Sequence, residues 1–446
     1  MSPPASAVCS ACARPSGVPR SRASQQLCLQ TPLHEAGKSA VCRREGVLSA
    51  LLFHSPPLSV PVTALGSPCA DRNNAPPENL SAMPERMTAA LAARLVASPL
   101  KYVLLDIDGV IWCGGHVIDR VPETLQYLRG QGKQIRFLSN NASFSREQLM
   151  QSLKAKGIEG VTVEECYNSA YTAALRLRQM LGKADVPGEE PLVHGNVFVI
   201  GEQGLHDELQ QVLAPGFITY GVELHDAVRA GGYDTDALGS AWRVPCLPPP
   251  QKRLVVCNGK ACRMVQAGTN SAEKISLSDL NAAAVVVGLD KHFNIVKLAY
   301  GSLVLQGPPK DLREESYTPP LFVATNEDPQ LPVGRDGTMI PGAGSMVSAL
   351  CTAVGKRPDA VCGKPHKDMA NILFAAEGVT NPREECIMIG DRLTTDVAFG
   401  NAAGCQSMLV LSGAEGLADV EEAEKQGRTA LVPKYVAESL ACFLPL

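Results

Sequence analysis

The chain has 446 residues, a formal net charge of −4, and 45% hydrophobic and 19% charged residues. This length suits two or three domains, and the composition is that of a globular protein with ample apolar residues for a core. The weak negative charge argues against a nucleic-acid partner, and no apolar run reaches the roughly 18 residues of a membrane span. We therefore expect a soluble protein that binds neither nucleic acid nor membrane.

The 15 cysteines indicate a reducing compartment rather than a disulfide framework. Most of them stand singly within apolar segments, as reduced core cysteines do. Cys9 and Cys12 have neither a second such pair nor a nearby pair of histidines, so the sequence does not favour a zinc site.

Residues 1–90 differ in composition from the rest of the chain. They are rich in Ser, Pro, Ala, Cys and Arg, and acidic residues are scarce between Met1 and Leu80. This composition is typical of a disordered leader or an organellar targeting peptide. A start upstream of the native one also fits, since Met83 and Met87 lie just before the regular pattern. We expect a cytoplasmic protein, or an organellar one if the leader is a functional transit peptide.

A regular alternation of strands and helices begins at Leu91. The first expected elements are a strand at 102–105, a helix at 121–129, a strand at 134–138, and a helix at 145–154 capped by Ser143. This order predicts a parallel sheet with right-handed crossovers, in a core formed by residues 91–181 and 358–446. The second part of that core has a strand at 359–364, a helix at 367–378, a strand at 386–390 and a final strand at 406–411.

Residues 182–357 are expected to form a second α/β unit inserted into this core. Its predicted strands lie at 196–200, 282–288 and 320–325, and its helices at 295–305 and 345–354. Residues 225–276 contain three consecutive prolines and no convincing periodicity. Because a structureless loop of that length is unusual within a compact domain, we interpret it as a disordered insertion on a loop.

The first predicted strand ends at Asp106-Ile107-Asp108-Gly109. If the strand continues through these residues, alternation places Asp106 and Asp108 on the same side. Burying two unpaired carboxylates is costly, and a divalent cation such as Mg²⁺ would compensate their charge. Gly109 would then let the chain turn away. A surface turn is the alternative interpretation, since Asp and Gly are ordinary turn residues.

Polar residues also follow three other predicted strands. They are Ser139-Asn140-Asn141, Lys364, and Asp391 with Asp396. In a parallel α/β sheet ligands bind at the carboxyl ends of the strands, so groups far apart in sequence converge there. Four such strand ends together predict a site that handles phosphate.

These four segments resemble the motifs of the haloacid dehalogenase-like hydrolases. The matching stretches are Asp106-x-Asp108-Gly-Val, Ser139-Asn-Asn, Gly363-Lys364-Pro and Gly390-Asp391-Arg-Leu-x-Thr-Asp396. The chain is particularly similar to the group of 4-nitrophenylphosphatases, phosphoglycolate phosphatases and pyridoxal phosphatases, over roughly residues 98–440 without the insertion. The resemblance implies a Rossmann-like parallel-sheet core with an inserted α/β cap domain, here residues 182–357.

The resemblance also implies a mechanism. Asp106 would be the nucleophile that forms an aspartyl-phosphate, and Asp108 the general acid and base. Mg²⁺ would be held by the Asp106 carboxylate, the main-chain carbonyl of Asp108, and Asp391. Asp396 would orient the metal shell or the lysine of the third motif rather than bind the metal.

The same resemblance assigns the phosphoryl oxygens to the other motif residues. Ser139, Asn140 and the backbone around Asn141 would hold these oxygens, and Lys364 would neutralise one of them. Asp108 at the second position after the nucleophile favours hydrolysis of a phosphate monoester over dehalogenation or phosphotransfer.

The substrate is expected to be a small-molecule phosphate ester. The loop at 326–332 resembles the family's substrate-specificity loop, in which pyridoxal phosphatases carry a histidine where this chain has Leu331. We therefore favour 2-phosphoglycolate over pyridoxal 5′-phosphate. A broad-range housekeeping phosphatase and a catalytically silent phosphate sensor are the alternatives. Relatives in this group often dimerise through the cap, so a homodimer is a further expectation.

Overall fold

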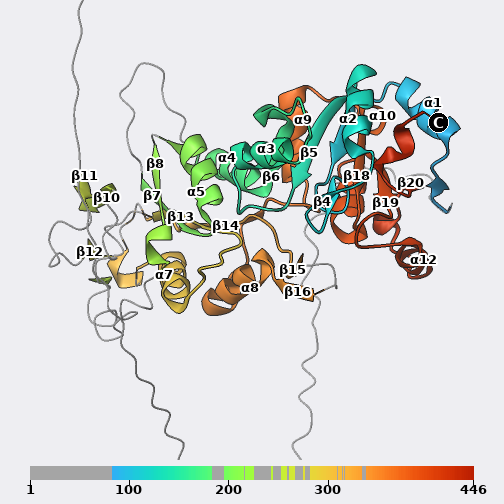
Figure 1. The fold of residues 1–446 in the computed structure, drawn as a ribbon. Coiled ribbons are helices and arrows are strands. Elements are labelled where there is room, and N and C mark those ends of the chain that lie inside the picture. The colour runs from blue at the N-terminus through green and yellow to red at the C-terminus, as the bar shows by residue number, and fades with distance from the viewer. Residues whose placement is uncertain are drawn as a thin grey trace, which may run out of the picture. The chain divides into compact units, whose positions relative to one another are not determined.

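The computed structural model describes residues 83–182, 195–214, 216–225, 282–308, 310–313, 315, 317–333 and 338–445 (Figure 1). It also describes the backbone of four short strands at 243–244, 253–258, 261–266 and 275–276. The expectations for residues 1–82 lie outside the described residues. Of the predicted leader, only residues 83–90 are described.

The first sheet has seven parallel strands in the order β1-β20-β19-β18-β2-β5-β6. Their bounds are β1 Glu85–Arg86, β2 Tyr102–Leu105, β5 Gln134–Ser139, β6 Cys166–Asn168, β18 Cys386–Gly390, β19 Gln406–Val410 and β20 Tyr435–Ala437. Figure 1 colours β5 and β6 teal and β18 to β20 red, which shows that two distant parts of the chain build one sheet. The expected parallel α/β core is confirmed.

Alternating side chains of this sheet pack against helices on its two faces. On one face, Val103, Leu105 and Phe137 join a core with α1, α2 and α3. On the other, Leu104 and Met388 pack with α9 and α11. The helices packed on these faces are α1 Ala89–Ala97, α2 Val121–Gly130, α3 Arg146–Ala155, α9 Asp368–Glu377, α11 Ala398–Ala402 and α12 Leu417–Lys425. The short helix α10 (Pro382–Glu385) leads into β18 and has no buried residue.

The second sheet has five parallel strands in the order β17-β14-β13-β7-β8. They are β7 Gly195–Ile200, β8 Phe217–Tyr220, β13 Ala282–Val287, β14 Leu321–Ala324 and β17 Ala360–Val361. Helices α7 (Ile295–Gln306) and α8 (Ala343–Val354) share a core with one face. Helices α4 (Ser169–Leu181) and α5 (Gln203–Leu213) cover the other face, so α4 leads directly from β6 of the first sheet to the second.

Three short antiparallel pairs and one longer hairpin complete the fold. They are β3 Trp112–Cys113 with β4 His116–Val117, β15 Gln330–Val333 with β16 Thr338–Pro341, β9 Arg243–Val244 with β12 Ile275–Ser276, and β10 Arg253–Asn258 with β11 Ala261–Gln266. The last two pairs correct the expectation that residues 225–276 lack regular structure. Asn258 pairs with Ala261, so the sequence between the two strands is Gly259-Lys260, with glycine at the first position as in many two-residue hairpin loops. The nearby prolines obscured that signal.

Several element boundaries also differ from expectation. Helix α3 is capped by Ser145, which forms a capping box with Gln148, and not by Ser143. The strand at 406–411 is not the last one, because β20 follows it. The strand expected at 359–364 is only β17, which pairs with β14 and therefore belongs to the second sheet rather than to the first. The leader ends earlier than residue 90, since β1 pairs with β20.

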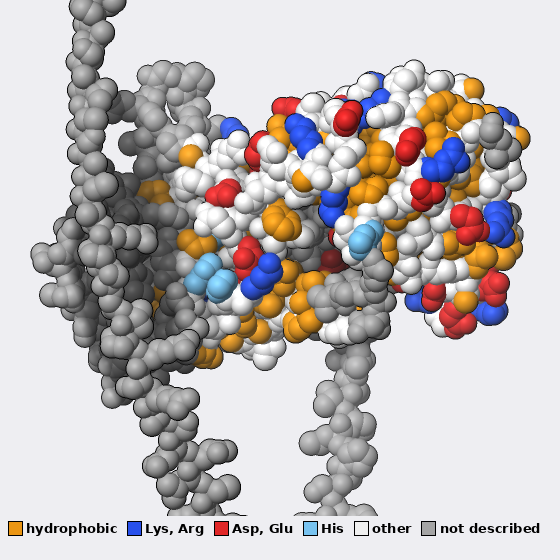
Figure 2. Space-filling view, viewed as in Figure 1, with side chains coloured by type: hydrophobic (Ala, Val, Ile, Leu, Met, Phe, Trp, Pro, Cys, Tyr) orange, Lys and Arg blue, Asp and Glu red, His pale blue; other side chains and the backbone are white. Residues whose placement is uncertain are grey.

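Among the described residues, no helix combines the length and the apolar character that crossing a bilayer requires. On the face drawn in Figure 2, Lys and Arg side chains lie among Asp and Glu side chains and do not gather into one basic patch.

Candidate active site

A cluster of carboxylates lies where β2 and β18 end. Asp106 follows β2, and Asp391 follows β18, beside β2 in the same sheet. Asp396 lies one turn further on, in the π-helical segment Leu393–Val397. Single carboxylate oxygens of Asp106, Asp391 and Asp396 all lie within 4.8 Å of one another. This donor set is of the type that holds a hard divalent cation.

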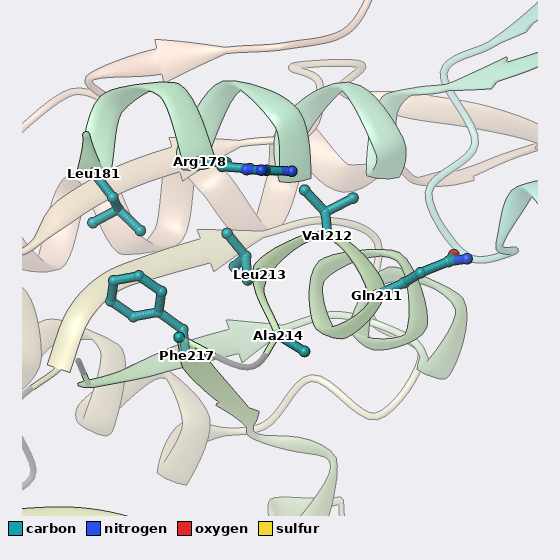
Figure 3. A pocket seen from close by; sticks show the side chains of 8 residues that line it. Arg178, Leu181, Gln211, Val212, Leu213, Ala214 and Phe217 are labelled. Atoms are coloured by element: carbon teal, nitrogen blue, oxygen red, sulfur yellow. The ribbon is translucent and has the colours of Figure 1, made fainter. Parts of the chain in front are cut away.

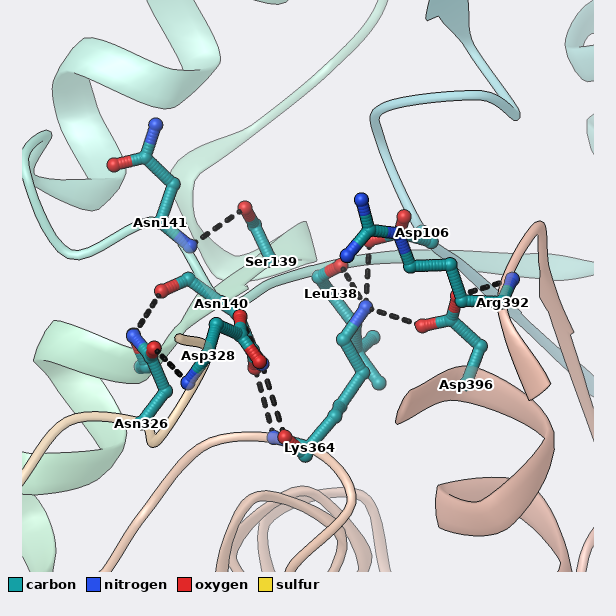
Figure 4. Close-up of polar contacts among 11 residues, drawn as sticks. Asp106, Leu138, Ser139, Asn140, Asn141, Asn326, Asp328, Lys364, Arg392 and Asp396 are labelled. Carbon is teal, nitrogen blue, oxygen red and sulfur yellow. Dashed lines mark hydrogen bonds and ion pairs between the residues drawn. The ribbon is translucent and has the colours of Figure 1, made fainter. Parts of the chain in front are cut away.

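Lys364 brings the opposite charge into this cluster. Its Nζ lies 2.6 Å from Asp106 Oδ1 and 2.8 Å from Asp396 Oδ1, and it donates to the carbonyl oxygen of Leu138 at 3.2 Å (Figure 4). The sequence placed Lys364 at the end of a strand of the first sheet. In the structure it lies in the loop after β17, which belongs to the second sheet. The two sheets therefore both contribute to the cluster.

Burial determines the electrostatics of the cluster. It raises the pKa of Asp106 well above its usual range, and Lys364 opposes that rise. Burial, followed by the charge of Asp396, raises the pKa of Asp391 to about 7. Although burial alone would lower the pKa of Lys364, the charges of Asp106 and Asp396 raise it above its usual value. Three carboxylates thus share one ammonium in a buried place, and this surplus of negative charge favours a cation.

The backbone of two loops, at Gly109 and at Ala414, packs closely against the Asp391 side chain. Gly109 has a φ of 82°, and a Cβ there would lie 2.2 Å from Asp391 Oδ2. On the other side, the main-chain N–H of Ala414 donates to Asp391 Oδ2 at 2.8 Å. The hydroxyl of Ser412 donates to the carbonyl oxygen of Gly109 at 2.7 Å and joins the two loops. The expected turn at Gly109 is confirmed, and its close approach to Asp391 gives it a second reason to be glycine.

Asp108 differs from Asp106 in its surroundings. Strand β2 ends at Leu105, so the alternation proposed for the two aspartates does not extend through them. Asp108 is exposed, and the indole Nε1 of Trp112 donates to its Oδ1 at 2.8 Å. An exposed carboxylate with a fixed orientation, two residues from the half-buried Asp106, suits proton transfer to and from solvent.

The Ser139-Asn140-Asn141 segment follows β5, next to β2 in the sheet. Ser139 is buried, and its Oγ accepts a hydrogen bond from the main-chain N–H of Asn141 at 3.1 Å. Asn141 is exposed, and its Oδ1 accepts from the N–H of Ser143 at 2.8 Å. In Figure 4 the Asn141 side chain points away from Lys364. Ser139 thus lies at the strand end as expected, whereas the side-chain amide of Asn141 forms a hydrogen bond within its own loop.

Asn140 does not present its side chain in the way expected of a phosphoryl-binding residue. Its Oδ1 accepts from the main-chain N–H of Lys364, and its Nδ2 donates to Asp328 Oδ2 and to the Lys364 carbonyl oxygen. Its own carbonyl oxygen accepts from Asn326 Nδ2 at 2.8 Å. The sequence placed Asn326 and Asp328 in the expected substrate-specificity loop at 326–332, but their contacts with Asn140 were not predicted.

Leu331, expected to set specificity, lies in β15 opposite Ile340 and is half-buried. A pocket of about 130 Å³ lies elsewhere, where α4 packs against the end of α5 (Figure 3). Its lining contains none of the predicted site residues: it consists of Arg178, Leu181, Gln211, Val212, Leu213, Ala214, Gly216 and Phe217. This pocket is therefore separate from the carboxylate cluster.

Comparison with known proteins points to one family. A model described as haloacid dehalogenase-like hydrolase matches residues 103–213, and a second, HAD-hydrolase-like model matches residues 361–441. Phosphoglycolate phosphatase 2 of Arabidopsis thaliana is 32% identical over 70% of this chain and 82% of its own length. The 4-nitrophenylphosphatase of Schizosaccharomyces pombe is 30% identical over 78% of this chain and 98% of its own.

Solved structures show the same fold. A glycerol phosphate phosphatase from Mycobacterium tuberculosis in complex with magnesium matches with a TM-score of 0.52 and 24% identity, over 78% of this chain and 77% of that one. The fold of that structure, the two matching family models and the carboxylates at the strand ends all indicate the same family. The chain therefore belongs to the haloacid dehalogenase-like hydrolase family and is grouped there with phosphatases.

Proposed function

We propose that the chain hydrolyses a small phosphate monoester, with a divalent cation, through an aspartyl-phosphate on Asp106. The observation that carries this proposal is the placement of the Asp106 carboxylate 2.6 Å from Lys364 Nζ, within a buried cluster that includes Asp391. A nucleophilic carboxylate beside a fixed ammonium and a cation site is the arrangement that phosphoryl transfer requires.

The residues present fit a divalent cation, and we take it to be Mg²⁺. Asp106 and Asp391 would hold it with their carboxylates, and Asp108 with its main-chain carbonyl. Asp396 belongs to the same carboxylate cluster, but its Oδ1 faces Lys364 and its Oδ2 accepts from the main-chain N–H of Arg392 at 3.2 Å. We therefore assign Asp396 to orienting Lys364. When bound, the cation neutralises phosphoryl charge, so that an anionic nucleophile approaches an anionic substrate.

The chain's own residues account for both chemical steps. Asp106 attacks phosphorus, the bond to the leaving oxygen breaks, and Asp108 gives that oxygen its proton. In the second step Asp108 takes a proton from water, which attacks the aspartyl-phosphate and releases inorganic phosphate and free Asp106. Trp112 would keep Asp108 oriented through both steps, and Lys364 would hold one oxygen of Asp106 in place.

For the substrate we propose 2-phosphoglycolate. The argument is that Leu331 offers neither an aromatic face nor an imidazole to a pyridine ring, and that three of the similar proteins are named for this activity. Pyridoxal 5′-phosphate and a broad range of small phosphate esters are the competing substrates. A silent phosphate sensor is disfavoured because Asp106, Asp108, Lys364 and Asp391 are all present.

Phosphate release by the full chain tests the proposal. We would compare 2-phosphoglycolate, pyridoxal 5′-phosphate, glycerol phosphate and 4-nitrophenyl phosphate, with Mg²⁺ and with EDTA. We expect Mg²⁺-dependent turnover with the highest kcat/KM for 2-phosphoglycolate, and its loss in Asp106→Asn. Exposed Asp119 provides the matched control, Asp119→Asn. Substantial turnover by Asp106→Asn would reject the nucleophile, whereas preference for another substrate would reject only the argument from Leu331.

A further inference from the structure

Asn140 connects three loops through every polar atom of its side chain. The Lys364 N–H donates to Asn140 Oδ1 at 2.8 Å. Asn140 Nδ2 donates to Asp328 Oδ2 and to the Lys364 carbonyl oxygen, both at 2.9 Å (Figure 4). An amide nitrogen has two hydrogens, so both donors of this side chain are in use. Asn140 therefore acts on neighbouring protein groups and leaves no amide hydrogen for a phosphoryl oxygen.

The loops joined in this way come from different sheets. Asn140 follows β5 of the first sheet, whereas Asp328 and Lys364 follow β14 and β17 of the second. The loop that carries Asp328 is also fixed from its other side. The N–H of Gly344, in the first turn of α8, donates to the Asp328 carbonyl oxygen at 2.9 Å. Asp328 is thus held between a helix start and Asn140.

These bonds determine where the Lys364 ammonium lies. A lysine side chain has four rotatable bonds, and it points in one direction only if both of its ends are fixed. Asn140 fixes the backbone end, through both the N–H and the carbonyl of Lys364. Asp106, Asp396 and the Leu138 carbonyl oxygen fix the Nζ end.

Glycine at position 363 is part of the same arrangement. A Cβ there would lie 2.7 Å from Asn140 Oδ1 and 2.8 Å from the carbonyl oxygen of Thr325. Such a Cβ would push the Lys364 loop away from Asn140.

We propose that Asp328 and Asn140 are positioning residues for the Lys364 ammonium. Asp328 orients the Asn140 amide, and this amide places the Lys364 backbone, so that Lys364 Nζ lies beside Asp106. The inference rests on the proposed function, because it assigns Lys364 to the phosphoryl-transfer step. It gives a residue of the predicted substrate-specificity loop a role in the chemical step that does not depend on the leaving group.

This role differs measurably from contact with the leaving group. If Asp328 acts through Lys364, Asp328→Ala lowers kcat by the same factor for every phosphate ester. We expect about 10- to 100-fold, the usual effect of displacing a catalytic group by up to about 1 Å. KM would change little. A leaving-group contact would instead change kcat/KM by different factors for different esters.

The experiment measures kcat and KM of the full chain with Mg²⁺ on 2-phosphoglycolate and 4-nitrophenyl phosphate, whose leaving groups differ in size and charge. Asp328→Asn keeps an oxygen that accepts from Asn140 Nδ2, and we expect it to restore kcat to within about threefold of wild type. The double variant Asn140→Ala/Asp328→Ala should be hardly slower than either single variant, since both act in one chain of contacts. Asp119→Ala is the matched control at an exposed aspartate.

A second readout does not depend on turnover. Hydrogen–deuterium exchange of the Lys364 main-chain N–H reports its bond to Asn140, and we expect faster exchange in Asp328→Ala and in Gly363→Ala. Gly130→Ala is the matched control, because a Cβ at Gly130 meets nothing within 4 Å. If Asp328→Ala does not fold, Asp328→Ser, whose hydroxyl is too short to reach Asn140, replaces it.

Each result has a defined meaning. Unequal factors for the two esters, failure of Asp328→Asn to restore kcat, additive effects in the double variant, or unchanged exchange at Lys364 would overturn the positioning role while wild-type turnover still supports the proposed function. Absence of wild-type turnover on every ester would reject the proposed function, and the catalytic part of this inference with it.

Discussion

At Asp391 the requirements of stability and of function conflict. It is 6% exposed and lies within the carboxylate cluster. Burial, and then the charge of Asp396, raises its pKa from 3.8 to about 7. In the metal-free protein, the folded state therefore binds this proton more tightly than the unfolded chain does. Ionised Asp391 opposes folding, and its cost grows as the pH rises from about 4 to about 7.

The magnitude follows from the size of the shift. A difference of about 3 pKa units corresponds to about 4 kcal/mol at 1.36 kcal/mol per unit. Asp391→Asn removes the charge and keeps an oxygen for the N–H of Ala414. We therefore expect the metal-free variant to be more stable than wild type at pH 8, by up to this amount. The advantage should shrink toward pH 5, where wild-type Asp391 is protonated as well.

Thermal unfolding of the full chain in EDTA, at pH values from 5 to 8, measures this difference. Added Mg²⁺ should raise the unfolding temperature of wild type and leave that of Asp391→Asn almost unchanged, because a ligand stabilises only the state that binds it. Asp119→Asn, at an exposed site, controls for the loss of one negative charge. A variant less stable than wild type at pH 8, or an advantage that does not vary with pH, would refute the reasoning.

Two contacts outside the cluster lead to predictions of other kinds. Lys297 and Asp290 form a fully buried ion pair at 2.5 Å. Lys297→Met leaves the buried carboxylate without its ammonium partner and should lower the free energy of unfolding by about 3–5 kcal/mol. An unchanged midpoint of urea unfolding would contradict this. Trp112→Phe keeps an aromatic ring but removes the donor to Asp108 Oδ1, and we expect kcat to fall about 2- to 10-fold with little change in unfolding temperature. An unchanged kcat would show that Asp108 needs no such orientation.

Much of the fold could be predicted because its signals are local. The apolar runs that form β2, β7, β13 and β18 are continuous and end abruptly, and the structure places all four within one or two residues of the expected bounds. Helix α3 was also predicted from a local pattern, although its N-cap was assigned to Ser143 instead of Ser145. The family resemblance added the pairing of distant strands, which local patterns do not contain.

The elements that were missed depend on hydrogen bonds to distant partners. Strands β1 and β20 are only Glu85–Arg86 and Tyr435–Ala437, too short for periodicity to reveal. Strand β17 looked like the start of a core strand, but its ladder to β14 decides which sheet it joins. The hairpin of β10 and β11 was overlooked because the prolines before it outweighed an ordinary turn signal.

The same limit applies within the site. The sequence predicts that Asn140 lies at a strand end near phosphate, but not whether its amide faces a ligand or the backbone of another loop. That choice is made by Asp328 and Lys364, which the chain supplies more than 180 residues later. Because Lys364 follows a strand of the second sheet, its ammonium lies beside Asp106 only when that sheet is folded and in place. Substitutions that loosen β14 or β17 should therefore slow the chemical step itself, and not only the recognition of the leaving group.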